Sequence, residues 1–180
     1  MSPGRVVILN GTSSSGKTTI AQTVRNRRGP DCAAVAIDQF YSSVHSEREN
    51  DWSLFCSLSE VLFASVAAFA DQGFDVVVDS VFERPACIEA CLYALREIHV
   101  SFVGLSCPLD ILERRERARG NRPNGLARNQ SGRVHEDCVY DLVLDTSESS
   151  VEECATRILE LFDASEWPAQ TTMVERTRID

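Results

Sequence analysis

The chain has 180 residues, a formal net charge of −9, and 43% hydrophobic and 25% charged residues. This composition excludes a disordered or fibrous chain, and the length predicts one domain over 1–180. An acidic protein lacks the positive field that binding to nucleic acid or to an anionic membrane requires, so neither is an expected partner. The seven cysteines form no C-x-x-C pair and the N-terminus carries no export signal, which predicts reduced thiols and a cytoplasmic location.

Short β-branched segments alternate with helical segments along the chain. Strands are predicted over 5–10, 33–37, 75–79, 99–106 and 140–145, and helices over 17–28, 54–72, 85–98, 109–119 and 151–162. Strands that are apolar on both faces and alternate with helices form a parallel sheet covered on both sides, so the fold class is three-layer α/β. The longest apolar-rich segment, 61–70, is too short to span a membrane. The residues from about 164 are polar and are expected to fray.

A phosphate-binding motif follows the first predicted strand. Residues 11–18 read GTSSSGKT and fit G-x-x-x-x-G-K-[ST] at every fixed position, which makes the fold a P-loop NTPase fold. The glycines let backbone N–H groups wrap around an anion, and the helix that follows adds its positive end. The lysine reaches the outer phosphates and the threonine hydroxyl suits Mg²⁺. The residues predicted to bind a nucleoside triphosphate, ATP or GTP, are Gly11, Ser13, Ser14, Ser15, Gly16, Lys17, Thr18 and Thr19.

Carboxylates stand at the ends of the predicted strands. Asp38 ends the second strand and Asp79 the third, and ligands of parallel sheets bind beyond the carboxyl ends of the strands. Asp79 is therefore predicted to hold Mg²⁺ together with Thr18, and Asp38 to accept the proton of an attacking hydroxyl. Asp is also common at helix starts and turns. For Asp145, at the end of the fifth strand, a turn fits as well as a contact with the nucleotide base.

Seven of the 17 arginines fall within a short stretch after the fourth strand. They are Arg114, Arg115, Arg117, Arg119, Arg122, Arg128 and Arg133. Some of them suit an ordinary solvated helix face, where Glu113 and Glu116 can pair with them. The stretch also leads into a turn-rich segment, so we expect a lid over about 114–133 whose guanidinium groups close over the transferring phosphoryl group.

Aromatic residues follow Asp38 and Asp79 at the same expected edge of the sheet. Aromatic rings suit the wall of a small-molecule site, although ordinary core packing fits them equally well. The segment over about 39–60 is therefore expected to form the acceptor site. The residues predicted to bind the acceptor are Asp38, Tyr41, Trp52, Phe55 and Phe82.

Several of these motifs occur together in one known family. They are Ile8–Gly11 before the phosphate loop, Asp38, Asp79–Phe82, Ala118–Arg122, Val134–Glu136, Tyr140–Asp141 and Asp145–Thr146. On these residues, and over roughly 6–155, the chain resembles the chloramphenicol phosphotransferase family within the nucleoside-monophosphate-kinase-like group of P-loop kinases.

The resemblance implies transfer of a phosphoryl group from a nucleoside triphosphate to a hydroxyl of an antibiotic. It implies that Asp38 takes the proton from that hydroxyl, that Lys17 is the phosphate-loop lysine, and that Arg119 and Arg122 are the lid arginines. The chain departs from the family at two places. Ser80 stands where a member of the family has an acidic residue, and the segment 39–53 is shorter and more polar than its counterpart in the family. The acceptor is therefore expected to be chloramphenicol or another antibiotic, such as a nucleoside or an aminocyclitol.

Two other functions use some of the same parts. A metabolic kinase acting on a nucleotide, a sugar acid or a nucleic-acid end would need an anion-binding pocket. The segment 39–53 offers Arg48 against three acidic residues, which disfavours a phosphorylated acceptor. A non-catalytic nucleotide switch would need neither Asp38 nor paired lid arginines. The sequence leaves open whether the chain forms a homo-oligomer.

Overall fold

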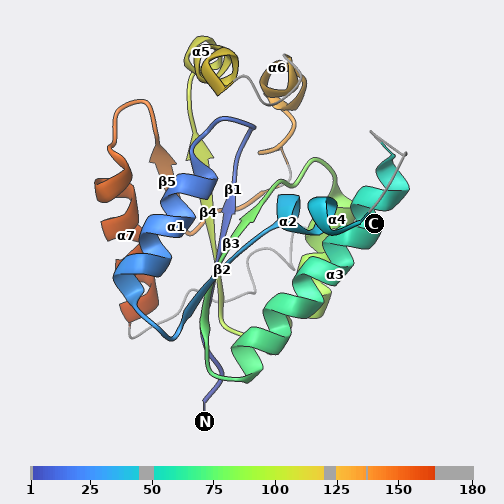
Figure 1. Ribbon diagram of the computed structural model, residues 1–180, viewed down its shortest axis with the longest axis vertical. Coiled ribbons are helices and arrows are strands. Elements are labelled where there is room, and N and C mark those ends of the chain that lie inside the picture. The colour runs from blue at the N-terminus through green and yellow to red at the C-terminus, as the bar shows by residue number, and fades with distance from the viewer. Residues whose placement is uncertain (1, 45–50, 120–124, 137, 165–180) are drawn as a thin grey trace.

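A computed structural model describes residues 2–44, 51–119, 125–136 and 138–164. All described strands join one sheet of parallel strands in the order β2-β3-β1-β4-β5 (Figure 1). The five strands are β1 (Val6–Asn10), β2 (Cys32–Ala36), β3 (Asp75–Ser80), β4 (Val100–Ser106) and β5 (Leu142–Asp145). The predicted five-stranded parallel sheet is confirmed.

Helices cover both faces of the sheet and one of its edges. They are α1 (Lys17–Arg28), α2 (Ile37–Ser43), α3 (Trp52–Asp71), α4 (Pro85–Ala94), α5 (Leu109–Arg119), α6 (Leu126–Gln130) and α7 (Val151–Asp163). In Figure 1, α1 and α7 lie on one side of the sheet and α3 and α4 on the other, and each pair is in contact. The short helix α2 contacts α3. Helices α5 and α6 lie in contact above the carboxyl ends of the strands.

Each face of the sheet has its own hydrophobic core. Neighbouring residues of a strand point to opposite faces, and on β1 Ile8 packs with the α3–α4 core while Leu9 packs with the α1–α7 core. Both side chains are fully buried, and Phe63 and Ile158 are fully buried on the two sides. This double burial explains why β1 reads as a continuous apolar run.

Helix α3 corrects the expectation that no segment is long enough to span a membrane. Its 20 residues are long and apolar enough to do so by length and composition. However, a row of its side chains, including Leu58, Leu62 and Val66, is buried in the α3–α4 core. This burial accounts for the apolar composition of α3 as that of a core helix.

Two short helices were not predicted. Helix α2 begins where a strand end was expected, and α6 lies in the segment that was expected to be only turns. Neither is long enough to show helical periodicity in the sequence. The predicted helix 85–98 also ends early, at Ala94. The tail after 164 lies outside the described residues.

Candidate active site

The candidate site lies at the carboxyl ends of the strands. The strand order reverses at β1, which pairs with β3 on one side and with β4 on the other. Open parallel sheets bind ligands where the order reverses. The loop between β1 and α1, residues 11–16, begins at this point and is the phosphate loop of the sequence analysis.

The backbone of the phosphate loop requires glycine at two positions. A Cβ atom on Gly11 would lie 2.6 Å from the carbonyl oxygen of Leu105 and 2.9 Å from Ser15 Oγ. Gly16, at the N-cap of α1, has a φ of 94°, and Ser14 also has a positive φ, of 67°. Such turns point successive N–H groups toward one centre and form a concavity for an anion.

Two buried hydroxyls in the loop support this assignment. The Oγ atoms of Ser13 and Ser15 are buried and have no hydrogen-bond partner among the residues that the structure describes. Buried polar atoms normally have a partner, so an unsatisfied pair calls for one. The first N–H groups of α1 are also available, because the start of an α-helix has no intrahelical acceptors for them. An anion such as a phosphate group would satisfy these donors.

Lys17 is held inside the phosphate loop. Its side chain is almost completely buried, and its Nζ donates hydrogen bonds to the carbonyl oxygens of Gly11 at 2.8 Å and Thr12 at 2.9 Å. The same Nζ lies 3.9 Å from Asp79 Oδ1. A buried ammonium needs such partners, and they keep it beside the loop where phosphate groups would bind.

Thr18 and Asp79 form the candidate metal site. The Thr18 hydroxyl donates a hydrogen bond of 2.6 Å to Asp79 Oδ2, which brings the ends of α1 and β3 together. Within the described ranges, no group of three or more His, Cys, Asp or Glu side chains is able to hold a metal ion. Mg²⁺ usually takes one or two protein oxygens and completes its shell with water and substrate phosphates, so the Thr18 hydroxyl and the Asp79 carboxylate are the oxygens that could hold it.

Asp38 lies in the first turn of α2, because β2 ends at Ala36. The prediction that Asp38 ends a strand is therefore wrong. Gln39 explains the early helix start, since its Oε1 accepts the Ala36 N–H at 2.9 Å as the third residue of a capping box does. Asp38 is exposed, and it lines one cavity together with Ser13 and Ser14 of the phosphate loop.

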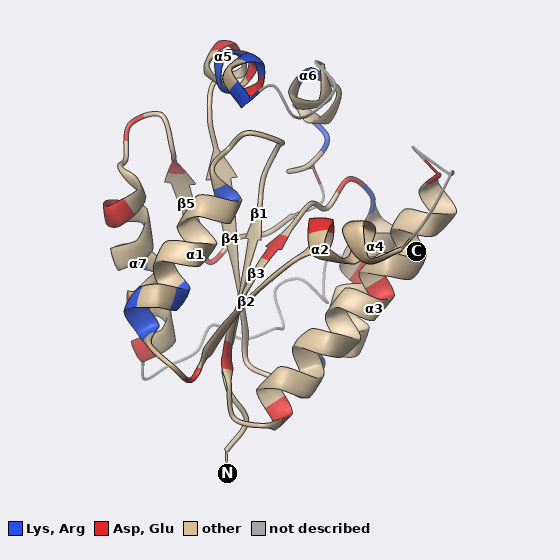
Figure 2. Cartoon of the chain, viewed as in Figure 1, with Lys and Arg blue, Asp and Glu red and all other residues tan. Residues whose placement is uncertain are grey.

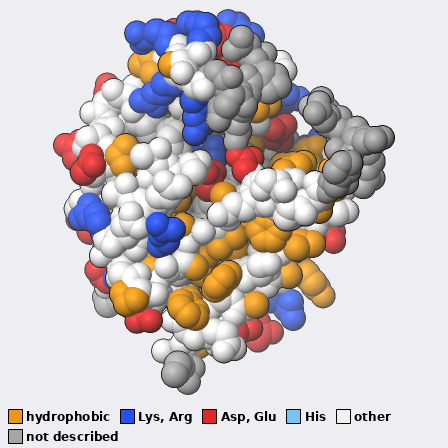
Figure 3. Space-filling model, in the orientation of Figure 1, with side chains coloured by type: hydrophobic (Ala, Val, Ile, Leu, Met, Phe, Trp, Pro, Cys, Tyr) orange, Lys and Arg blue, Asp and Glu red, His pale blue; other side chains and the backbone are white. Residues whose placement is uncertain are grey.

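A cavity of about 40 Å³ brings several predicted site residues together, and we call it the central cavity. It is lined by Ser13, Ser14, Gly16, Lys17, Thr18, Ile37, Asp38, Asp79, Val81, Arg119 and Gln130. Figure 2 shows the acidic positions of β3 and α2 below the basic helix α5, and Figure 3 shows acidic side chains in a hollow beneath the basic ones. Cationic groups, carboxylates and the phosphate loop therefore face one small space.

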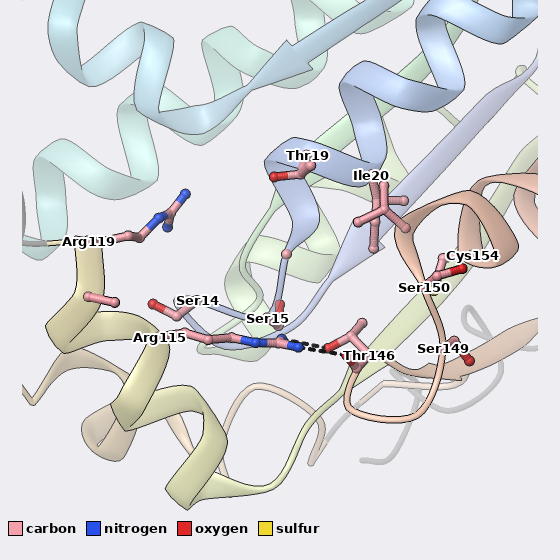
Figure 4. Close-up of a pocket in the computed structure, with 13 residues that line it drawn as sticks. Ser14, Ser15, Thr19, Ile20, Arg115, Arg119, Thr146, Ser149, Ser150 and Cys154 are labelled. Atoms are coloured by element: carbon pink, nitrogen blue, oxygen red, sulfur yellow. Dashed lines mark hydrogen bonds between the residues drawn. The ribbon is translucent and has the colours of Figure 1, made fainter.

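A second cavity, which we call the lateral cavity, adjoins the other side of the loop. It has a volume of about 550 Å³ and lies between the phosphate loop, α5 and the start of α7. Its lining is Ser14, Ser15, Gly16, Thr19, Ile20, Arg115, Ala118, Arg119, Thr146, Ser149, Ser150, Val151 and Cys154, of which Figure 4 labels most. This volume is within the range of small-molecule sites, and its position suits the nucleoside of a bound nucleotide.

Arg115 and Thr146 meet in the lateral cavity, a contact that was not predicted. Arg115 reaches across the lateral cavity and donates to Thr146 Oγ1 at 3.1 Å and to Thr146 O at 2.7 Å (Figure 4). Arg115 precedes Arg119 by one helical turn, so this spacing in the sequence could have indicated that the two arginines lie on the same face of α5.

Asp145 forms the turn that the sequence analysis gave as one of its two alternatives. Its carboxylate accepts the Ser147 N–H at 2.8 Å, and the hydrogen bond from the Ser147 hydroxyl lowers the pKa of Asp145.

The predicted arginines have different surroundings. Arg119 is exposed and lines both cavities, whereas Arg114 lies 3.5 Å from Asp110 and Arg128 lies 2.7 Å from Glu113 on the surface. Arg122 lies outside the described residues. Of the described arginines of the stretch, Arg119 is therefore the one that borders both the phosphate loop and Asp38.

The predicted acceptor residues separate into two groups. Trp52 stacks on Phe55 with ring centroids 5.0 Å apart, and Tyr41 lies 6.1 Å from Phe55. All three are half-buried. Burial, followed by the charges of Glu83 and Asp38, raises the pKa of Tyr41 to about 12. Phe82 is 2% exposed and lies in the core, against which the other three rings pack. None of the four predicted aromatic rings lines the central or the lateral cavity, which agrees with the core-packing alternative.

Asn10 connects the end of β1 to two flanking segments. Its Nδ2 donates to Tyr140 Oη at 2.7 Å and to Val134 O at 2.6 Å, and its Oδ1 accepts the Phe82 N–H at 2.9 Å. His135 Nδ1 lies 2.7 Å from Tyr140 Oη. The segment that follows the arginine stretch is therefore hydrogen-bonded to Asn10, the residue directly before the phosphate loop.

Comparisons with known proteins agree with this geometry. A candidate O-phosphotransferase of Mycobacterium tuberculosis is 25% identical over 194 residues, which cover 93% of this chain and 86% of that protein. The structure of the Mycobacterium tuberculosis APS kinase CysC, in complex with AMPPNP and APS, has a TM-score of 0.76 at 20% identity and covers 91% of this chain and 100% of that chain. Shikimate kinase from Acinetobacter baumannii, in complex with shikimate, has a TM-score of 0.66 at 15% identity, with 89% and 93% covered.

These likenesses show the fold of P-loop kinases. The family model of the chloramphenicol phosphotransferase-like proteins matches residues 4–163, which is most of the chain. The chain therefore belongs to the chloramphenicol phosphotransferase-like family.

Proposed function

We propose that the protein transfers the γ-phosphoryl group of ATP or GTP to a hydroxyl of a small-molecule antibiotic. The observation that carries this proposal is the central cavity, where Lys17, Asp79 and Thr18 of the phosphate-binding side meet Asp38 and Arg119. A nucleotide in the lateral cavity would enter the central cavity with its outer phosphates. An alcohol that approaches from α2 would meet the γ-phosphorus beside Asp38.

The reaction follows from the charges that line the central cavity. The acceptor oxygen attacks the γ-phosphorus, its proton passes to the Asp38 carboxylate, and the bond from the γ-phosphorus to the leaving nucleoside diphosphate breaks. Lys17 and Arg119 neutralise the charge that develops on the phosphoryl oxygens. A non-catalytic switch would not need a carboxylate at the position of Asp38, and its place beside Lys17 supports catalysis.

Mg²⁺ is the metal that fits the site. Thr18 Oγ1 and Asp79 would hold it, directly or through water, and it would supply charge neutralisation between the outer phosphates. Lys17 Nζ lies near Oδ1 of Asp79, and the Thr18 hydroxyl is hydrogen-bonded to Oδ2 of the same carboxylate. Asp79 would therefore orient both the Lys17 ammonium and the metal ion.

The acceptor side of the cavity favours a neutral or cationic alcohol. Asp38 and Glu83 both act on Tyr41, so two carboxylates lie near this ring. The Arg84 guanidinium covers the Trp52 ring at 4.4 Å and is engaged there. A carboxylate or sulfate on the acceptor would meet repulsion here, which separates the proposal from a kinase for acceptors such as shikimate or APS.

The proposal is tested by transfer of a labelled γ-phosphate. The purified protein is incubated with Mg²⁺ and labelled ATP or GTP, and with chloramphenicol, nucleoside antibiotics, aminocyclitol antibiotics, and shikimate as an anionic control. We expect label on a hydroxyl of at least one antibiotic and none on shikimate. Label on shikimate alone would favour a metabolic kinase, and no labelled alcohol despite nucleotide binding would reject the proposal.

We also propose that the protein acts in the cytoplasm. The seven cysteines are scattered along the chain and form no C-x-x-C pair. Such a distribution is typical of the reduced thiols of a protein in a reducing compartment. Whether the protein assembles into a homo-oligomer is measured directly by light scattering.

A further inference from the structure

Gln130 links the phosphate loop to the acceptor side of the site. It is the last residue of α6 and is 5% exposed. Its Oε1 accepts the backbone N–H of Ser13 at 2.6 Å, and its Nε2 donates to Glu83 Oε1 at 2.7 Å. One side-chain amide therefore joins three segments that are far apart in the sequence.

The two partners fix the orientation of this amide. The Ser13 N–H can only donate and the Glu83 carboxylate accepts, so Oε1 must face the loop and Nε2 must face Glu83. The reversed amide would place two donors together at Ser13 and two acceptors together at Glu83. A glutamate at this position would keep the bond to Ser13 and oppose Glu83.

Helix α6 is also held at its other end. Glu116 of α5 is 4% exposed and accepts the N–H groups of Gly125 at 2.8 Å and Ala127 at 2.9 Å. These bonds fix the start of α6 to α5. With α6 anchored, the amide of Gln130 reaches Ser13 and Glu83 from a defined position.

Glu83 is the partner of Gln130 that lies outside the phosphate loop. It follows β3, it is half-buried, and it lies near Tyr41, whose pKa its charge helps to raise. The next residue, Arg84, covers Trp52. Gln130 itself lines the central cavity together with Asp38. The amide thus spans from the donor side of the cavity to the acceptor side.

We propose that Gln130 is a positioning residue that couples nucleotide binding at the phosphate loop to the placement of Glu83, and that Glu83 receives a hydrogen-bond donor of the acceptor, a hydroxyl or an ammonium group. Only the contact between Glu83 and the acceptor rests on the proposed function. The coupling between the two residues does not depend on the acceptor's identity.

A double-mutant cycle on nucleotide affinity tests the coupling. MgAMPPNP is titrated into the wild-type protein, Gln130→Ala, Glu83→Ala and the double variant, and thermal unfolding checks that each is folded. Gln130→Ala removes the contact that holds the backbone of Ser13 in place, so the loop must be ordered on binding and we expect about tenfold weaker binding. Glu83→Ala lets the amide rotate, and we expect about threefold weaker binding. The double variant should bind no more weakly than Gln130→Ala, because both act through one amide.

Two results of the cycle would overturn the coupling. One is a Glu83→Ala protein with wild-type affinity for MgAMPPNP. The other is a double variant whose loss equals the product of the two single losses, since Glu83 would then act without Gln130.

A second pair of variants covers the case in which Gln130→Ala does not fold. Gln130→Glu faces Glu83 with a second carboxylate and should lower the midpoint of thermal unfolding. Adding Glu83→Gln restores a donor to the new carboxylate, and we expect the midpoint to recover by about 3 °C. If the double variant with Gln130→Glu and Glu83→Gln unfolds at the same midpoint as Gln130→Glu alone, the contact between residues 130 and 83 is rejected.

The acceptor contact is measured separately. With an alcohol that the wild-type protein phosphorylates, Glu83→Gln should raise the acceptor KM about tenfold and leave the nucleotide KM unchanged. An unchanged acceptor KM would reject the contact. If no alcohol is phosphorylated, the proposed function and the acceptor contact fail together, while the coupling is still decided by the MgAMPPNP cycle.

Discussion

Lys17 is the residue on which the phosphate loop depends most directly. The chain has 18 basic residues, and Lys17 is the only lysine among them. The structure gives this exception a physical reason, because Nζ is enclosed by the carbonyl oxygens of Gly11 and Thr12 and by Asp79. A compact ammonium fits these three oxygens, whereas a guanidinium is broad and planar.

Lys17→Arg should therefore weaken nucleotide binding although it keeps the charge. The larger head cannot keep both bonds to the loop carbonyls, so we expect about tenfold or greater loss of MgAMPPNP affinity. The affinity is measured by titration calorimetry. Arg96→Lys, on the surface beside Glu97, is the control and should bind normally. Full affinity and activity in Lys17→Arg would show that the lone lysine has no special role.

Arg119 should act on the transfer step more than on binding. It lines both cavities, and in the central cavity it lies with Lys17 and Asp38, where the proposed transfer takes place. We expect Arg119→Ala to lower kcat by about 10²-fold to 10³-fold with labelled ATP and the acceptor from the screen. Arg114→Ala, on the same helix and paired with Asp110, should leave kcat near the wild-type value. Equal losses in both variants would argue against a specific role for Arg119.

At the scale of elements, the periodicity of apolar residues predicted the strands and the long helices that are buried on one face. The five strands and the helices α1, α3, α4 and α7 carry apolar patterns that the sheet core explains. The short helices α2 and α6 depend on single side-chain contacts, such as Gln39 to Ala36 and Glu116 to Gly125. The first contact is local, three residues apart, and the second joins residues nine apart, and neither produces a periodic apolar pattern.

Glu116 is the contact that holds α5 and α6 together. Burial would raise its pKa, but the N–H groups of Gly125, Ala127 and Leu126 outweigh this effect and lower the pKa. Glu116→Gln leaves one of these buried N–H groups without an acceptor, so we expect unfolding to become easier by about 1–3 kcal/mol. Glu113→Gln, which removes the surface pair with Arg128, should cost about 1 kcal/mol at most. Urea unfolding of the two variants compares them, and equal losses would contradict the role of Glu116.

At the scale of the whole molecule, the parallel sheet assembles the site from distant segments. Position at strand ends predicted that Asp38 and Asp79 would approach the phosphate loop, and the central cavity brings all three together. It predicted neither the contact of Arg115 with Thr146 nor the link that Gln130 makes between Ser13 and Glu83. These contacts depend on the directions of side chains across the cavities, which spacing along the chain does not define.

The pH dependence of the free energy of unfolding should depend on His135, which contacts Tyr140 in the segment hydrogen-bonded to Asn10. Burial, together with repulsion by Lys17, lowers the pKa of His135 from its usual 6.5. The unfolded chain then binds the proton more readily than the folded protein does. This contribution to stability is complete above about pH 6.5 and is lost as the pH falls through the folded pKa. The midpoint of thermal unfolding should therefore fall between pH 7 and 5 in the wild-type protein and fall less in His135→Gln. Identical slopes in the two proteins would show that His135 is not the group responsible.

The most direct test of phosphoryl transfer is the turnover of Asp38→Asn with labelled ATP and an acceptor that the wild-type protein phosphorylates. Asn keeps the size of the side chain but cannot take the proton of the hydroxyl, so kcat should fall by about 10²-fold to 10⁴-fold. MgAMPPNP should bind Asp38→Asn as tightly as wild type, because the phosphate loop and Asp79 are unchanged. A variant that keeps wild-type kcat would contradict the assignment of Asp38 as the base and, with it, the proposed mechanism.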